Sequence, residues 1–395
     1  MTAKTDEIVI LSAARTPIGT FGGSLAALPP TRLATIAAKA ALDRAGIAGD
    51  RIGATVFGHV INTEPRDMYL ARVAAIDAGI PDTVPAMNVN RLCGSGAQAI
   101  VSAAQVLMLG EADFALAGGA ECMSRSPHIL PSARFGQKMG DVKALDMMTG
   151  ALTCPFGTGH MGVTAENVAA ERGIDRAAQD AFALESQTRA ARAIAEGRFR
   201  DQIVPVEIET RKGIVTFDTD EHPKATSAEA LAGLKPVFQK DGTVTAGNAS
   251  GINDGAAALV LARAGAAEAA GLTPRARILG HAVAGVPPRI MGVGPIPAVR
   301  LLCERTGLTP DAFDVVESNE AFAAQALAVS AALNLDPAKV NPNGGAIALG
   351  HPVGATGAIL AVKALAELDR TGGRLGLITM CIGGGQGIAI AIERL

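Results

Sequence analysis

Three glycine-rich segments carry the side chains whose types suit chemistry. They are residues 90–97 (NRLCGSGA), 350–357 (GHPVGATG) and 380–385 (MCIGGG), which hold Cys93, His351 and Cys381. Cys93 stands just before an Ala-rich helical pattern, where unsatisfied backbone N–H groups favour a thiolate. Because glycine lets another molecule approach the backbone closely, each segment leaves room for a substrate. Taken alone, Cys93 is explained equally well as a buried, inert thiol.

Together, two cysteines and one histidine at glycine-rich strand ends indicate one kind of reaction. A Cys93 thiolate would attack an acyl carbonyl and hold the acyl group as a thioester. His351 would take the proton from that thiol, and Cys381 would remove or return a proton next to a thioester carbonyl. The N–H groups of residues 383–385 are placed to bind an oxyanion. The set predicts acyl transfer followed by Claisen condensation, or the reverse reaction.

The elements that must position these groups alternate between strand and helix signals. In the first 120 residues we expect strands at 7–11, 54–60 and 113–117, and helices at 31–45, capped by Thr31, and at 96–109. This rhythm predicts a mostly parallel sheet covered by helices, and therefore an α/β fold.

The last 120 residues repeat the same plan. Strands are expected at 314–317 and 375–380, and helices at 354–369 and from Asn319 or Glu320 to 333. Each half also has an Asn-x-Asn entry, at 88–90 and at 341–343. The same order of signals in both halves indicates an internal duplication.

The stretch from 122 to 250 has a different character. Met, Arg, His and Pro become frequent, a charged helix is expected at 175–196, and apolar strand character returns near 256–262. We therefore expect three parts: an N-terminal half at 1–121 completed by about 251–271, an insertion at 122–250, and a C-terminal half at 272–395.

Composition excludes several classes of protein. With 49% hydrophobic and 18% charged residues, the 395-residue chain is not disordered. A net charge of −3 with 11 Phe, one Tyr and no Trp argues against a nucleic-acid binder. No apolar run is long enough to span a membrane. Five widely spaced cysteines without a CxxC pair predict neither a disulfide framework nor a metal site, and favour a cytoplasmic protein.

The sequence resembles the thiolases, the acetyl-CoA acetyltransferases and β-ketothiolases, along essentially its whole length. Besides the three segments above, the matching motifs are NEAFAAQ at 319–325, GHMG at 159–162 with TAEN at 164–167, and TAGNASG at 245–251. The resemblance implies a thiolase-like fold, in which two duplicated mixed-sheet α/β halves form five layers, αβαβα. It also implies that residues 122–250 are an inserted loop domain that binds coenzyme A.

The resemblance also assigns roles to residues. Cys93 would be the acylated nucleophile, His351 its activator and Cys381 the acid/base of the condensation. Asn319 would hold a water that completes one oxyanion hole with His351. The backbone N–H groups of Cys93 and Gly383 would form the other.

Coenzyme A is implied as a substrate or product, not as a permanently bound cofactor. Acetyl-CoA and 3-ketoacyl-CoA would be the reacting partners. The residues implied to contact coenzyme A are His160, Met161, Ser250, Ala321 and Phe322 along the pantetheine channel, with Lys224 as a looser cationic contact. Segment 124–146 resembles the family's tetramerisation loop, so the resemblance implies a homotetramer, a dimer of dimers.

Two departures bear on the acyl group. Gly159 precedes the His-Met pair where short-chain thiolases often carry an aromatic residue, and segment 64–70 (EPRDMYL) looks like β-ketothiolases of broader acyl tolerance. We therefore expect a pocket that accepts more than acetyl, while the physiological direction stays open.

Two alternatives remain beside the thiolase reaction. A decarboxylating ketoacyl synthase of similar fold uses Cys-His-His or Cys-His-Asn sites, which Cys381 argues against. A non-catalytic acyl-CoA or lipid carrier would not need Cys93, His351 and Cys381 together.

Overall fold

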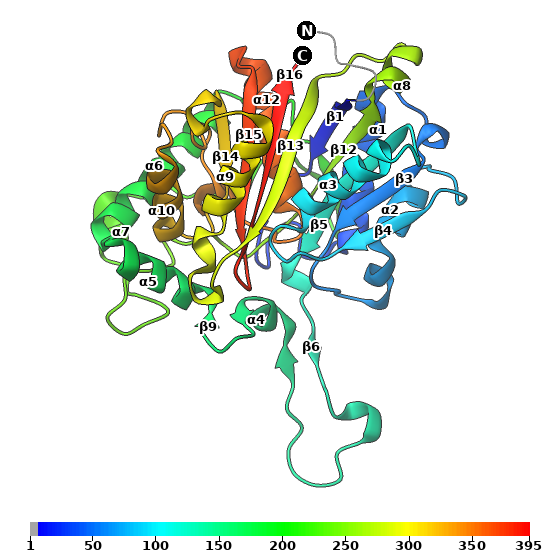
Figure 1. The fold of residues 1–395 in the computed structure, drawn as a ribbon. Coiled ribbons are helices and arrows are strands. Elements are labelled where there is room, and N and C mark those ends of the chain that lie inside the picture. The colour runs from blue at the N-terminus through cyan, green and yellow to red at the C-terminus, as the bar shows by residue number, and fades with distance from the viewer. Residues whose placement is uncertain (1–6) are drawn as a thin grey trace.

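A ten-stranded mixed sheet connects the two halves of the molecule (Figure 1). The computed structural model describes residues 7–395, so the first six residues of the expected N-terminal half lie outside the described residues. The main path of the sheet runs β14 (Val315–Ser318), β15 (Leu375–Ile382), β16 (Gln386–Arg394), β13 (Ala276–Gly285), β1 (Ile8–Arg15), β12 (Asn253–Arg263), β5 (Phe114–Cys122), β3 (Ala54–Gly58) and β4 (Ala86–Val89), and β2 (Gly19–Thr20) pairs with β12.

The two halves join where β1 meets β13. Only two residue pairs, Val9 with Arg277 and Ile10 with Ala276, link these strands. Within each half the sheet is mixed: β3 runs parallel to β4 and β5, and β14 runs parallel to β15, while the other ladders are antiparallel. The expected pair of mixed-sheet halves is therefore present, with one short seam between them. The mostly parallel sheet expected from the alternation of strands and helices is wrong, because most of the ladders are antiparallel.

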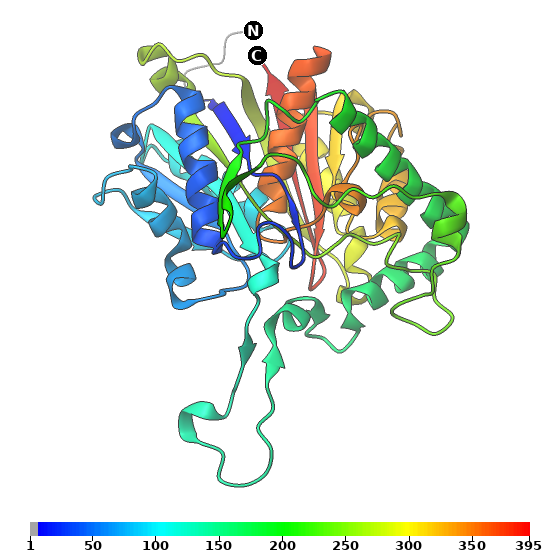
Figure 2. The ribbon, with the colours of Figure 1, turned by 180° about the vertical axis from the view of Figure 1, so that it is seen from behind.

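Helices form the other layers around these strands. Helices α1 (Pro30–Ala45) and α2 (Leu70–Asp77) cover the outer face of the N-terminal half, and α9 (Pro295–Thr306) and α10 (Ala323–Leu333) cover that of the C-terminal half. Between the halves, α3 (Ser95–Met108) packs against α12 (Thr356–Thr371). Figures 1 and 2 show the two faces, with α3 and α9 in front in one view and α1 and α12 in front in the other. The order is αβαβα, as expected.

Glycine and alanine allow the central helices to touch. A Cβ atom on Gly96 of α3 would lie 2.7 Å from the backbone nitrogen of Ala358, and one on Gly357 of α12 would lie 2.3 Å from that of Ala97. Any larger side chain at these two positions would push the helices apart. The close crossing brings the first turns of both helices together at one end of the molecule.

Residues 123–252 form an irregular segment in which four α-helices and three short strand pairs are joined by long loops. Its helices are α4 (Met147–Ala151), α5 (Met161–Arg172), α6 (Arg176–Ala195) and α7 (Ala228–Ala232), and its strand pairs are β6 (His128–Ile129) with β7 (Leu145–Asp146), β8 (Thr153–Cys154) with β9 (Gly159–His160), and β10 (Val206–Thr210) with β11 (Gly213–Phe217). The β6–β7 ribbon projects far from the body of the molecule (Figure 1). Two further short helices, α8 (Ala264–Ala269) and α11 (Ala346–Leu349), complete the fold.

Three expected element boundaries are wrong. Thr31 does not cap α1, because the helix begins at Pro30, has Pro29 as its N-cap and no side-chain cap; the fixed φ of proline suits this first position. Strand β5 continues through Gly118 and Gly119 to Cys122. Helix α10 begins only at Ala323, since Asn319 and Glu320 make long-range contacts in place of a first helical turn.

None of the helices within residues 7–395 has the length and apolar character that crossing a membrane requires.

Candidate active site

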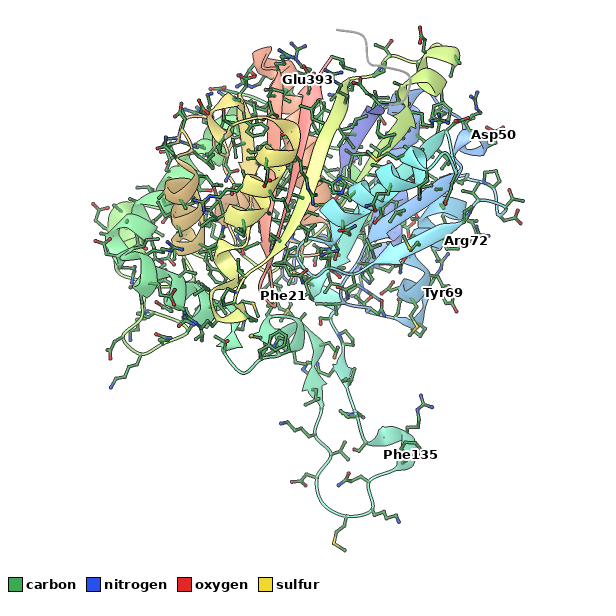
Figure 3. The ribbon with its side chains drawn as sticks, viewed as in Figure 1. Phe21, Asp50, Tyr69, Arg72, Phe135 and Glu393 are labelled. Atoms are coloured by element: carbon green, nitrogen blue, oxygen red, sulfur yellow. The ribbon has the colours of Figure 1, made fainter. Side chains whose placement is uncertain are left out.

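A pocket of about 530 Å³ opens where the two halves meet the irregular segment. In Figure 3, Phe21, which lines this pocket, lies at the lower edge of the two halves, above the projecting ribbon. The pocket brings together ten of the residues predicted from sequence: Cys93, His351, Cys381, Gly383, His160, Met161, Lys224, Ser250, Ala321 and Phe322. The remaining one, Asn319, is buried beside His351.

A strained turn presents Cys93 at the start of α3. Leu92 has a φ of 46°, a left-handed conformation that costs a non-glycine residue on the order of 1 kcal/mol. Side chains on both sides hold this turn: Asn90 Oδ1 accepts from the Leu92 N–H at 2.9 Å, and the Ser95 hydroxyl donates to the Leu92 carbonyl at 2.6 Å. Cys93 is thereby fixed at the pocket wall, partly exposed.

The Cys93 thiol is not the preformed thiolate that its place before a helix suggests. Burial raises the pKa of Cys93, the backbone N–H groups of Gly383 and of Cys93 itself lower it, and the charge of Glu121 raises it again. The net pKa is above the usual value, because loss of solvation outweighs the helix start. The two N–H groups against the sulfur are those expected to bind an oxyanion.

His351 is held in one tautomer by the first turn of α12. Its Nδ1 lies 2.6 Å from the Thr356 hydroxyl, and that hydroxyl donates its own hydrogen to the Pro352 carbonyl at 2.9 Å. The hydroxyl must therefore accept from Nδ1, which leaves Nε2 without a hydrogen. Burial lowers the pKa of His351 to about 4. At neutral pH the ring is thus an uncharged base.

Two asparagines hold His351, one through its backbone and one through its ring. The backbone N–H of His351 donates to Asn253 Oδ1 at 2.9 Å, and Asn319 Nδ2 lies 3.4 Å from the ring nitrogen Nε2. The backbone N–H of Asn319 donates to the Thr379 carbonyl at 3.0 Å, which ties it to the strand that carries Cys381. Asn319 Oδ1 is buried and has no protein hydrogen-bond partner, so an acceptor is available next to the histidine.

Cys381 lies near the end of β15 and is buried among apolar side chains that include Met161, Met291 and Phe322. Burial raises the pKa of Cys381, and the neighbouring Cys93 raises it further. A thiol with a raised pKa is a poor acid but, once ionised, a strong base. Cys93, His351 and Cys381 thus face one pocket as thiol, neutral imidazole and thiol.

An aromatic stack shapes the outer part of the pocket. The His160 ring stacks on Phe238 at 4.7 Å between centroids, and Phe238 meets Phe322 edge-on at 6.1 Å. Ser250 is placed by its backbone, since its N–H donates to the Ala321 carbonyl at 3.0 Å. Lys224 is exposed at the pocket edge, and burial, followed by the charge of Lys224, lowers the pKa of His222 to about 4.

Sequence reasoning missed four residues that support these groups. Thr356 lies within the GHPVGATG segment, so that motif could have indicated it, whereas no local sequence pattern indicates Asn253. Glu320 accepts hydrogen bonds from the Ser186 hydroxyl at 2.6 Å, Asn341 Nδ2 at 2.8 Å and the Ile347 N–H at 3.2 Å. No local sequence pattern indicates Phe238, because its ring contacts with His160 and Phe322 exist only in the folded chain.

The fold and the pocket together fit a class of enzymes that hold an acyl group on a cysteine and move protons with a histidine and a second cysteine. The family model for the N-terminal domain of thiolases matches residues 8–265, and that for the C-terminal domain matches residues 272–394. The chain belongs to the thiolase family.

Individual relatives are similar to this chain over its whole length. The chain is 58% identical to the beta-ketothiolase BktB of Cupriavidus necator, over 99% of this chain and all of the relative. It is 50% identical to an acetyl-CoA acetyltransferase of Thiocystis violacea, with the same coverage. The crystal structure of human mitochondrial 3-ketoacyl-CoA thiolase in complex with CoA superposes with a TM-score of 0.96 at 43% identity, covering 100% of this chain and 99% of the human one.

Proposed function

We propose that the protein catalyses the thiolase reaction. An acyl group passes from acyl-CoA to Cys93, and Claisen condensation with acetyl-CoA gives 3-ketoacyl-CoA; the reverse is thiolysis by free coenzyme A. The observation that carries this proposal is the pocket in which Cys93, His351 and Cys381 meet, with the Nε2 lone pair of His351 unprotonated. The carrier and the decarboxylating synthase are not favoured, because neither explains a second thiol at position 381.

In the first step Cys93 becomes acylated. His351 Nε2 takes the thiol proton as the sulfur bonds to the acyl carbonyl carbon. The N–H groups of Cys93 and Gly383 stabilise the oxygen that becomes negative. The carbon–sulfur bond to coenzyme A then breaks, and the leaving thiolate takes the Cys381 proton. This step leaves an imidazolium at His351 and a thiolate at Cys381.

The second step uses both of those charged groups. The Cys381 thiolate removes a proton from the methyl group of acetyl-CoA, and the resulting carbanion attacks the Cys93 thioester. His351 Nε2–H, with a water held by Asn319, stabilises the acetyl-CoA oxygen during this attack. The bond from carbon to Cys93 breaks, and His351 returns its proton to the sulfur. All three side chains end as they began.

Coenzyme A is proposed as substrate and product, with no permanently bound cofactor. Pocket residues support a path for it: the pantetheine arm would pass His160, Met161, Ser250, Ala321 and Phe322, with Lys224 beside the phosphates. A cation at the pocket edge can pair with the phosphates of the nucleotide, and the apolar wall can pack against the pantetheine arm.

The acyl pocket is proposed to accept more than acetyl. Leu92, Met161 and Met291 line it, and thioether side chains adapt to substrates of different shape. One methylene in a hydrophobic pocket changes rates by about 10–200-fold. Because the thioethers adapt, we expect 3-ketovaleryl-CoA or 3-ketohexanoyl-CoA to lie at the low end of that range, cleaved at a rate within about tenfold of acetoacetyl-CoA. Thiolysis rates at equal substrate concentrations measure this. Activity on acetoacetyl-CoA alone would contradict a broad pocket, and no thiolysis of any substrate would contradict the function.

A homotetramer, assembled as a dimer of dimers, is proposed from the β6–β7 ribbon. Figure 3 shows Phe135 at its far end, and Phe135 and Met139 are 91% and 88% exposed. Two such side chains on a projecting ribbon favour burial against a second copy. We expect Phe135→Glu with Met139→Glu to convert the tetramer to a dimer in sedimentation equilibrium. Ile214→Glu, on another exposed hairpin and 65% exposed, is the matched control; a tetrameric double variant would refute the role of the ribbon.

The three-part division is also proposed for this chain: 1–121 completed by 251–271, then 122–250, then 272–395. It is supported by β12, which lies between β1 and β5 of the first half. Five unpaired cysteines support a cytoplasmic location.

A further inference from the structure

Glu121 is a buried carboxylate at the meeting point of the two halves. It lies on β5, and its oxygens accept from the N–H groups of Val60 at 3.0 Å, Ile61 at 3.1 Å and Gly354 at 3.0 Å. His59 Nδ1 lies 3.2 Å from the same carboxylate. Burial raises the pKa of Glu121 above its usual value, and His59 and the three N–H groups offset only part of this rise. Three backbone N–H donors reach the two carboxylate oxygens, which suits an ionised carboxylate. His59 Nδ1 also lies 2.9 Å from the Ala120 carbonyl, so its hydrogen is not given to Glu121 alone.

The internal duplication shows that packing does not demand this charge. Gly96 and Gly357 occupy equivalent places where α3 and α12 cross, and counting 25 residues onward from each gives Glu121 and Ile382. A Cβ on Gly354, before α12, would lie 2.4 Å from Glu121 Oε2, and one on Gly94, before α3, would lie 2.5 Å from Ile382 Cδ1. At these two equivalent positions the C-terminal half has the apolar side chain of Ile382 and the N-terminal half has the carboxylate of Glu121. Burying a carboxylate costs free energy.

One hydrogen bond and one charge effect connect Glu121 with the proposed chemistry. Gly354 belongs to the turn between His351 and Thr356, so the carboxylate holds the turn that sets the histidine. Glu121 is also the charged side chain that raises the pKa of Cys93. Besides Cys93, the titratable side chains that line its pocket are His351, Cys381, His160, His222 and Lys224; Glu121 is not among the lining residues.

We propose that Glu121 is a positioning residue for the reaction: its hydrogen bond to Gly354 holds the His351 turn across the junction of the halves, and its charge acts on the resting Cys93 thiol. The part that concerns His351 rests on the proposed function. The part that concerns the thiol does not, because it applies to the enzyme without substrate. A resting thiol reacts slowly with electrophiles and oxidants, and its proton then leaves only when His351 and an acyl carbonyl act together.

The test separates charge from shape with two variants. Glu121→Gln keeps the length and removes the charge, while Glu121→Asp keeps the charge and shortens the reach. The rate at which iodoacetamide alkylates Cys93, located by peptide mass, is measured against pH, together with kcat and KM for thiolysis. In Glu121→Gln the midpoint of alkylation is expected to fall by about 0.5–1 pH unit, because removing a nearby negative charge favours the thiolate. Its kcat is expected to fall about tenfold, the loss of one charged hydrogen bond, with KM within about twofold.

Glu320→Gln is the matched control, because Glu320 is also buried and accepts only from donors, but from the other side of His351. It is expected to lower kcat without moving the alkylation midpoint. Glu121→Asp is expected to lower kcat and keep the wild-type midpoint, and it decides the question if Glu121→Gln does not fold. An unmoved midpoint in Glu121→Gln, or an equal shift in Glu121→Asp or Glu320→Gln, would overturn the proposal. An enzyme without thiolysis would sink the proposed function while leaving the alkylation result valid.

Discussion

Cys93→Ala is expected to lower both thiolysis and condensation by about 10⁴-fold or more, the loss typical of removing a covalent nucleophile. The variant keeps the pocket, since alanine fits the turn that Leu92 and Ser95 hold. Without the thiol no acyl-enzyme can form, so neither direction has its first intermediate. The decisive measurement is the intact mass after incubation with acetyl-CoA: the wild-type chain gains one acetyl group and the variant gains none.

Cys303→Ala provides the comparison for this experiment. Cys303 is buried in the outer cluster of the C-terminal half, on α9, away from the pocket. Its variant is expected to form the acetyl-enzyme and to retain turnover within about twofold, with only a modest loss of stability. If Cys93→Ala still gained the acetyl group, another residue would be the nucleophile and the proposed mechanism would fail.

Cys381→Ser is expected to separate the two steps of the reaction. Cys93, His351 and the N–H of Gly383 are unchanged in this variant, so the acetyl adduct on Cys93 still forms. Condensation requires removal of a proton from the acetyl-CoA methyl group, and a serine hydroxyl ionises far less readily than a thiol. We expect condensation to fall by about 10²–10⁴-fold, the range that general base catalysis contributes. Mass spectrometry follows the first step, and the rate of acetoacetyl-CoA formation follows the second.

Cys154→Ser is the matched control, because Cys154 belongs to the same apolar cluster as Cys381 but does not line the pocket. It is expected to condense acetyl-CoA within a few-fold of the wild-type rate. Full condensation activity in Cys381→Ser would refute the role assigned to the second thiol, whereas equal losses in both variants would point to disturbed packing of the cluster.

Local patterns were sufficient for much of the fold and for the residues of the pocket. The strands and helices expected in both halves are present, and the glycine-rich segments at 90–97, 350–357 and 380–385 do converge. The predicted boundaries of helices are wrong where hydrogen bonds to residues distant in sequence hold the chain outside the helix. Asn319 and Glu320 have helical neighbours in sequence, but His351, Asn341 and Ser186 hold them outside α10.

By itself, the sequence determined which candidate reactive side chains the chain carries and that two related α/β halves carry them, because residue types and short-range periodicity record both. Only the tertiary structure decided their protonation states. His351 is neutral, with its proton on Nδ1, because it is buried beside Thr356. Cys93 is a resting thiol because burial and Glu121 outweigh the N–H groups at the helix start. Solvation and charge depend on contacts between residues as far apart as Glu121 and Gly354, and no local pattern contains them.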